Sequence, residues 1–132
     1  MIEIKKTQIM NPTKKILVID DDSKNIYALS AVLKAKGYES ISAQSAKQGL
    51  TLLNEDPSIG LVLLDMMMPE MDGYQALREI KKNPDLQNIP VIAVTAQAMT
   101  GDKEKCLEAG ADGYLSKPVA MAELLNLLQT HL

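Results

Sequence analysis

The sequence predicts an α/β protein in which a doubly wound, five-stranded parallel sheet is covered by five helices within a single domain. Short apolar segments alternate five times with longer segments of helical periodicity, and the connections between them are short. Parallel strands need crossover connections, which are usually helices, and right-handed crossovers place those helices on both faces of the sheet. The run Ile59–Asp65 is apolar up to its last residue, which is typical of a strand buried on both faces.

Five short apolar runs are expected to form the strands. They are Lys15–Ile19, Tyr38–Ala43, Ile59–Asp65, Val91–Val94 and Ala111–Leu115. The second run is half polar, which suits an edge of the sheet. Pro69 forces a turn after the third run because proline lacks the N–H that a strand ladder requires, and Pro90 leads into the fourth run.

Each run is followed by a segment in which apolar residues recur at helical spacing. These segments open near Ser23, Ser45, Asp72, Asp102 and Ala120. Ser23, Ser45 and Asp72 are suitable N-caps, and glycines or Asp-Pro and Asn-Pro pairs end the first four segments. The stretch Asp102–Ala109 has only a weak apolar stripe, which fits either a mobile helix that binds a partner or a solvated helix.

The composition excludes several classes of function. The 132 residues suffice for one compact domain, preceded by residues 1–13, which read as a flexible leader or an expression remnant. A net charge of −3 without a basic block argues against nucleic acid, and no stretch resembles a membrane span or a signal peptide. The single Cys106 fits a reducing, cytoplasmic location. The only histidine, His131, lies at the C-terminus, so histidine-based metal or nucleophilic chemistry is not expected.

Four of the five expected strands carry a notable polar residue at the carboxyl end. These residues are Asp20 with Asp21, Asp65, Thr95 and Lys117. Taken singly, each has a simpler explanation: helix capping, a residue of a polar turn, a turn hydroxyl and a solvated charge. In an open doubly wound sheet, however, ligands bind outside the carboxyl ends of the strands, so the fold brings all of them to one rim.

Three carboxylates on one rim require a compensating cation. At an effective dielectric constant of about 20, two like charges ~4 Å apart repel by about 4 kcal/mol. Mg²⁺ prefers oxygen ligands and is typically held by one or two carboxylates together with a phosphate. With a lysine and a hydroxyl beside it, such a site suits the transfer of a phosphoryl group onto an aspartate.

The motifs at these strand ends resemble the receiver domain of two-component response regulators. They are ILVIDDD, LVLLDMMMPEMDG, VIAVTA and GYLSKP, in this order, and the resemblance covers residues 14–132. It implies the strand order 2-1-3-4-5 and a receiver that takes a phosphoryl group from a histidine kinase or a histidine phosphotransfer protein. Its downstream protein target is unknown.

The resemblance also assigns residues to the acceptor and to the metal. Asp65 matches the phosphoacceptor. Asp20 and Asp21 match the acidic pair that holds Mg²⁺, with Asp21 favoured as the direct ligand. The backbone carbonyl of Met67 matches the remaining protein ligand.

Three further residues match the switch of the family. Thr95 matches the hydroxyl that moves toward the phosphoryl group, and Lys117 matches the lysine that pairs with it. Tyr114 matches the aromatic switch position, which turns inward when Thr95 has moved. The resemblance further implies a cis peptide bond between Lys117 and Pro118.

Two other functions stay open at this point. A phosphohydrolase with an aspartyl-phosphate intermediate typically needs a second acid two residues after the nucleophile, where this chain has Met67. A receiver-shaped interaction module that is never phosphorylated is the other alternative. The joint presence of Asp21, Asp65, Thr95 and Lys117 argues against that module.

The chain is therefore expected not to be an enzyme beyond slow autodephosphorylation. Met67 offers no polar group to orient a hydrolytic water, whereas the amide of Gln97 is a candidate for that role. The stretches DDSKNIYAL and TAQAMTGDKEKCLEAGADGYLSKPV are similar to receivers of hybrid sensor kinases. The chain is expected to be a stand-alone regulator or, with a slight preference, a receiver excised from such a kinase.

Overall fold

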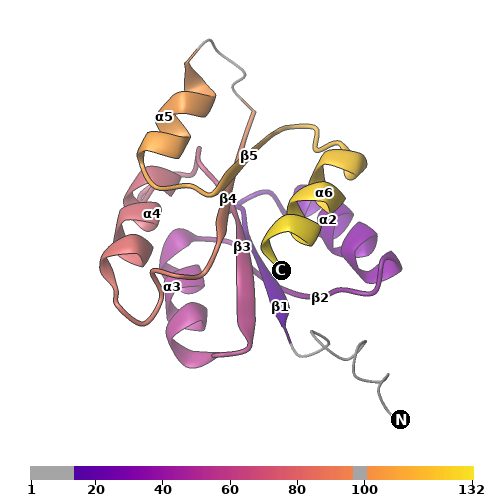
Figure 1. The fold of residues 1–132 in the computed structure, drawn as a ribbon, viewed down its shortest axis with the longest axis horizontal. Helices are drawn as coiled ribbons and strands as arrows, with labels where there is room; N and C mark the ends of the chain where they lie inside the picture. Colours follow the sequence, from indigo (N-terminus) through magenta and orange to yellow (C-terminus); the bar gives the residue numbers. More distant parts are fainter. Residues whose placement is uncertain (1–13, 97–100) are drawn as a thin grey trace.

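The strands and helices alternate as the sequence predicts, in a computed structural model that describes residues 14–96 and 101–132. The strands are β1 (Lys15–Ile19), β2 (Glu39–Ala43), β3 (Ile59–Asp65), β4 (Val91–Thr95) and β5 (Gly113–Ser116). The helices are α2 (Ser23–Ala35), α3 (Ala46–Glu55), α4 (Gly73–Lys82), α5 (Asp102–Glu108) and α6 (Met121–His131). The sheet is parallel throughout, and its order β2-β1-β3-β4-β5 confirms the expected topology (Figure 1).

The strand β3 is the centre of the molecule because its two faces belong to two separate cores. Val62 and Leu64 lie in the core under α3, α4 and α5, and Leu61 and Leu63 lie in the core under α2 and α6. All four side chains are at most 1% exposed, and burying each stabilises the fold by about 1.5–3 kcal/mol. Figure 1 shows the two helical layers on opposite sides of the sheet.

Most boundaries agree with the sequence prediction to within one residue, and hydrogen bonds explain two of those that differ. Asp22, not Ser23, is the N-cap of α2, because Asp22 has an extended backbone and its carboxylate accepts the N–H of Lys24 at 3.0 Å. The last strand begins at Gly113 rather than Ala111, because the N–H of Ala111 is taken by the carbonyl of Cys106 at the end of α5 (3.1 Å). The predicted N-caps Ser45 and Asp72 are confirmed.

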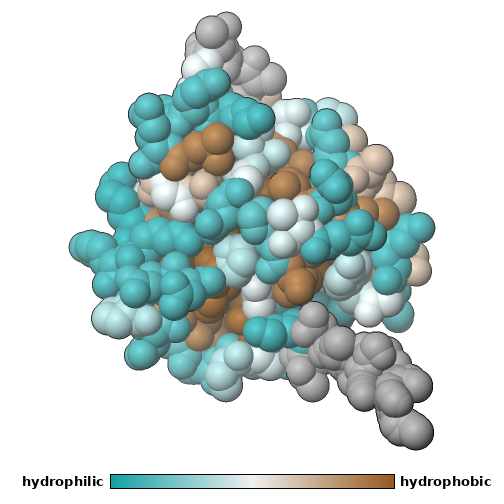
Figure 2. All heavy atoms as spheres, in the orientation of Figure 1, coloured by the Kyte–Doolittle hydropathy of each residue, from teal (hydrophilic) through white to brown (hydrophobic). Residues whose placement is uncertain are grey.

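The surface of the described chain is mostly hydrophilic on the face that Figure 2 shows, with small separate hydrophobic patches. Among residues 14–96 and 101–132, no helix has the length and hydropathy that crossing a lipid bilayer demands. The expected leader, residues 1–13, and Gln97 lie outside the described residues.

Candidate functional site

Three polar side chains are buried in the described part of the chain, and all three stand at carboxyl ends of central strands. Asp20 directly follows β1 and is 2% exposed, Asp65 ends β3 and is 3% exposed, and Thr95 ends β4 and is 1% exposed. Burying an ionised carboxylate is costly unless a cation or hydrogen bonds compensate it. These strand ends are therefore the place where the fold accepts an energetic cost, which is typical of a functional site.

Asp20, Asp21 and Asp65 form an acidic cluster. One carboxylate oxygen from each lies within 4.8 Å of the other two, and the Asp21 side chain is exposed to solvent. Burial is the main cause that raises the pKa of Asp65 to about 6, and the negative charge of Asp20 adds to it. Three oxygen donors that repel one another, with one side open, fit a hard divalent cation such as Mg²⁺.

Lys117 is the cation that the fold itself supplies to this cluster. Its Nζ lies 3.1 Å from Asp20 Oδ2 and 3.5 Å from Asp65 Oδ2. Burial lowers the pKa of Lys117, but the hydrogen bond to Asp20 and the charge of Asp65 outweigh this effect, so the net pKa is raised. Lys117 therefore stays protonated while it faces both carboxylates.

The backbone after β5 fixes the position of Lys117. The N–H of Lys117 donates to the carbonyl of Thr95 at 2.8 Å, which ties the ends of β4 and β5 together. The peptide bond between Lys117 and Pro118 is cis, as expected. Lys117, Thr95 and the acidic cluster thus share one rim of the sheet.

Asn25 is a residue of this site that the sequence analysis missed. Its side-chain amide donates to Asp20 Oδ2 at 2.5 Å, and the N–H of Asp22 donates to Asp20 Oδ1 at 2.8 Å. Both oxygens of Asp20 are thus held in place. The signal in the sequence was an asparagine in the first turn of α2, which the fold turns back toward the end of β1.

The residues after Asp65 hold that carboxylate from the other side. The N–H of Met67 donates to Asp65 Oδ1 at 3.0 Å, and the Met67 side chain is half exposed. Met66 and Met68 are buried in the core under α3 and α4, where their flexible side chains fill apolar space.

The hydroxyl of Tyr114 contacts α5 and not the acidic cluster. Its hydroxyl donates to Asp102 Oδ2 at the start of α5, at 2.9 Å. Burial and this hydrogen bond raise the pKa of Tyr114 to about 12. The structure thus brings the acceptor, the expected metal residues and Lys117 together, and it places the expected aromatic switch residue against α5.

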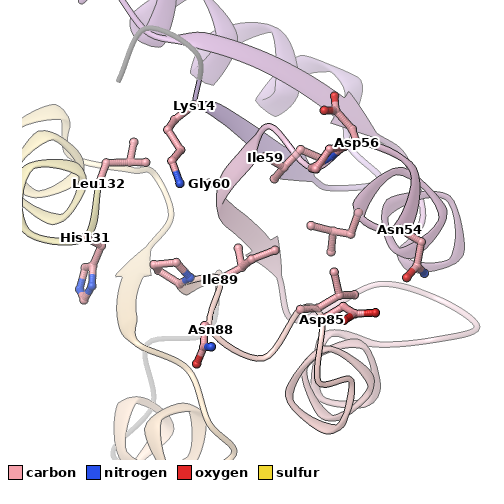
Figure 3. A pocket seen from close by; sticks show the side chains of 14 residues that line it. Lys14, Asn54, Asp56, Ile59, Gly60, Asp85, Asn88, Ile89, His131 and Leu132 are labelled. Atoms are coloured by element: carbon pink, nitrogen blue, oxygen red, sulfur yellow. The ribbon is translucent and has the colours of Figure 1, made fainter. Parts of the chain in front are cut away.

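A hollow lies at the opposite end of the sheet, where the strands begin. Its volume is about 530 Å³, and it is lined by residues such as Lys14, Asp56, Ile59, His131 and Leu132 (Figure 3). None of the site residues expected from the sequence lines it. The chemistry of the strand ends, rather than the size of a hollow, therefore identifies the candidate site.

Comparison with known proteins identifies the family of the chain. Residues 16–129 match the family model of the response regulator receiver domain. The polar-differentiation response regulator DivK of Brucella ovis is 33% identical over 120 residues, which cover 91% of this chain and 97% of DivK.

Solved structures give the same result. The receiver domain of the Francisella response regulator 1452 has a TM-score of 0.80 at 32% identity, over 88% of this chain and 93% of that one. The receiver domain of the sensor histidine kinase PA1611 from Pseudomonas aeruginosa PAO1, solved with a magnesium ion in its active-site cleft, has a TM-score of 0.80. It is 35% identical, over 89% of this chain and 95% of that one. The chain therefore belongs to the response regulator receiver domain family, whose members act in two-component signalling.

Proposed function

We propose that this receiver accepts a phosphoryl group on Asp65 from a histidine kinase or a histidine phosphotransfer protein, that the transfer depends on Mg²⁺, and that it changes the partner-binding face. The observation that carries the proposal is the surroundings of Asp65. This buried carboxylate lies within 4.8 Å of two other carboxylates and 3.5 Å from a lysine ammonium.

The transfer needs an ionised Asp65. A carboxylate oxygen of Asp65 forms the new P–O bond while the P–N bond of a phosphohistidine breaks, and the imidazole leaves with that electron pair and takes up a proton. A pKa of about 6 leaves most Asp65 side chains ionised at neutral pH. Lys117, already 3.5 Å away, stabilises the negative charge that the phosphoryl group brings.

The hydrogen bonds of the acidic cluster indicate which carboxylates are available to bind a metal ion. Asp20 has both oxygens engaged by Asp22, Asn25 and Lys117, whereas the Asp21 side chain is exposed. We therefore assign Asp21, Asp65 and the backbone carbonyl of Met67 as direct ligands, with Asp20 completing the negative site. When bound, Mg²⁺ supplies positive charge to the transferring phosphoryl oxygens.

The switch is proposed to run through Thr95 and Tyr114. Thr95 ends β4 directly after Val94, and Val94 pairs with Asp65 across the sheet. We propose that the Thr95 hydroxyl moves toward the phosphoryl group on Asp65. Such a shift leaves room for Tyr114 to turn inward and to leave Asp102. The face formed by α5, β5 and α6 then changes, and an unknown downstream protein reads that change.

We also propose that the chain acts in the cytoplasm, as a signalling domain rather than an enzyme. The side chain two residues after Asp65 is Met67, which lacks the acid that a phosphohydrolase needs, so we propose at most slow autodephosphorylation. The similarity to DivK and to the PA1611 receiver supports a stand-alone regulator and a kinase-derived receiver about equally.

Intact mass after incubation with Mg²⁺ and a small acyl-phosphate donor tests the proposal. We expect the mass of one phosphoryl group to be gained by the wild type and by Asp85→Asn, a control at an exposed aspartate, but not by Asp65→Asn. The gain should also disappear when Mg²⁺ is chelated. A wild type that binds Mg²⁺ yet gains no mass would instead support an interaction module that is never phosphorylated.

A further inference from the structure

The helix α5 has little apolar anchorage of its own. It has seven residues, of which only Cys106 is buried. Its N-cap is Gly101, which has a φ of 87° and no side chain to cap the helix. Leu107 is 41% exposed, and Figure 2 shows a small hydrophobic patch over this helix. A helix this short is not stable by itself, so contacts from neighbouring elements must hold it in place.

Two tyrosine hydroxyls from different elements reach α5. Tyr114 on β5 contacts Asp102, which belongs to the switch already described. Tyr74 on α4 makes a second contact, in which its hydroxyl lies 3.5 Å from Cys106 Sγ. The Nζ of Lys105 also lies 4.7 Å from the centre of the Tyr74 ring, a cation–π geometry.

Tyr74 is connected closely to the residue that follows Asp65. Its neighbour Gly73 donates its N–H to the carbonyl of Met66 at 3.3 Å. A Cβ atom at position 73 would lie 2.5 Å from Met66 Cα, so the start of α4 packs directly on the backbone at Met66. Because the two backbones are in close contact with no free space between them, a shift of Met66 must displace the start of α4 and Tyr74 with it.

A hollow separates the loop after β3 from α5 on this side. Its volume is about 420 Å³, and Met66, Met67, Tyr74, Asp102 and Lys105 are among the residues that line it. Tyr74 crosses from α4 to α5 beside this hollow. Burial is the main cause that raises the pKa of both Tyr74 and Cys106, so both groups stay neutral and their contact persists at physiological pH.

We propose that Tyr74 is a positioning residue that ties α5 to the loop after Asp65, so that a change at Asp65 alters the stability of α5 by a route separate from Thr95 and Tyr114. Tyr74 does this with two groups, its hydroxyl toward Cys106 and its ring toward Lys105. Because coupling between two sites is reciprocal, a partner that binds α5 also changes the acceptor loop. The part of the proposal that concerns phosphorylation rests on the proposed function, whereas the tether itself does not.

Hydrogen exchange of the α5 amides tests the tether in the unmodified protein. Tyr74→Phe keeps the ring and removes the hydroxyl, and Tyr27→Phe is the matched control because Tyr27 is 77% exposed on α2. A hydrogen bond to sulfur is weak, so we expect Tyr74→Phe to speed exchange at Lys105 and Ala109 about two- to fivefold. Tyr27→Phe should leave those amides unchanged, and equal protection in Tyr74→Phe and wild type would overturn the proposal.

A double-mutant cycle separates this contact from general loosening. Cys106→Ala removes the partner of the hydroxyl. The double variant Tyr74→Phe with Cys106→Ala should therefore speed exchange by less than the product of the two single effects. Fully multiplicative effects would show that the two residues act independently. Amides of β3 serve as the internal check that each variant remains folded.

The coupling to Asp65 is tested by repeating the exchange after acyl-phosphate labelling, with labelling measured by intact mass. We expect the wild type and Tyr27→Phe to change α5 exchange on labelling, and Tyr74→Phe to show about half of that change or less. An undiminished change in labelled Tyr74→Phe would overturn the coupling. If no variant is labelled, the proposed phosphorylation fails, while exchange in the unmodified protein still decides the tether.

Discussion

Two aspartates stand at opposite ends of the central strand, and their surroundings are opposite in character. Asp56 precedes β3, where the backbone N–H and the hydroxyl of Ser58 and the Nζ of Lys15 all donate to it. Hydrogen bonds from Ser58 are the main cause that lowers the pKa of Asp56. Asp65 ends β3, where burial raises the pKa to about 6. The same side chain is thus stabilised as an anion at one end and destabilised at the other.

This difference shows how the fold separates stability from chemistry. The end with Asp56 has a hollow of about 530 Å³ but satisfied, partly solvated charges (Figure 3). The rim with Asp65 has buried charges that repel one another, and among the described residues a single lysine pairs with them. A metal ion and a phosphoryl group can therefore gain much more interaction energy at the rim than at the other end of the strand.

The largest expected effect comes from removing Lys117, in contrast to removing Lys15 at the other end of β3. Lys117→Ala should slow acyl-phosphate labelling of Asp65 about 10²- to 10³-fold, because a preorganised cation at the transferring group is lost. Lys15→Ala removes the 3.2 Å ion pair with Asp56 and should leave labelling unchanged. The measurement is the time course of mass gain at fixed Mg²⁺. Equal slowing by both substitutions would mean that Lys117 acts only through the stability of the fold.

The next expected effect is on stability, and it has opposite signs for Asp65→Asn and Asp56→Asn. In buffer containing a chelator at neutral pH, Asp65→Asn should raise the free energy of unfolding by about 1–2 kcal/mol, because it removes a buried charge that Asp20 repels. Asp56→Asn should lower the free energy of unfolding, because it replaces a carboxylate that three donors stabilise. Denaturant titrations of both variants measure this contrast, and a destabilised Asp65→Asn would contradict it.

A smaller effect concerns the lifetime of the phosphoryl group at the rim. Met67→Asn places an amide beside Asp65 that can orient a hydrolytic water, so we expect the phosphoryl group to be lost about tenfold faster. Met67→Leu keeps the site apolar and should leave the lifetime unchanged. The decay of the mass gain after removal of the donor measures both. An unchanged lifetime in Met67→Asn would show that Met67 does not control access of water.

The sequence predicted the sheet and most of the rim because both follow from local patterns. Apolar runs and caps place the strands, and a parallel sheet brings Asp20, Asp65 and Lys117 to one edge whatever their other contacts. Asn25 and Tyr74 could not be predicted in this way. Their roles depend on where side chains of α2 and α4 point once the helices are packed, and an asparagine or a tyrosine on a helix gives no signal of its partner.

The N-cap of α2 shows the same limit at a smaller scale. Asp22 and Ser23 are equally good caps by residue type, so sequence alone did not separate them. Asp22 is the cap because its N–H is already bound by Asp20 Oδ1, which fixes the extended backbone that an N-cap needs. The hydrogen bonds of the acidic cluster thus decide where the neighbouring helix begins.

The last expected effect is the pH dependence that follows from the two aspartates, measured again with a chelator present. The pKa of Asp65 is raised from 3.8 in the unfolded chain to about 6, so the folded state binds more protons between these values. Its contribution to stability is therefore present below pH 3.8 and is lost as the pH rises through about 6. The pKa of Asp56 is lowered, so its contribution is present above pH 3.8 and is lost as the pH falls through its folded value.

Each slope can be isolated by subtracting the matching asparagine variant. The free energy of unfolding of the wild type minus that of Asp65→Asn should fall as the pH rises from about 4 to about 6. The difference between the wild type and Asp56→Asn should be flat in that window and should fall only in more acidic buffer. If the two differences in free energy of unfolding had the same pH dependence, the two ends of β3 would not shift the pKa of a carboxylate in opposite directions. Added Mg²⁺ sharpens the comparison, because a cation bound at the rim lowers the pKa of Asp65 and should flatten its curve without changing that of Asp56.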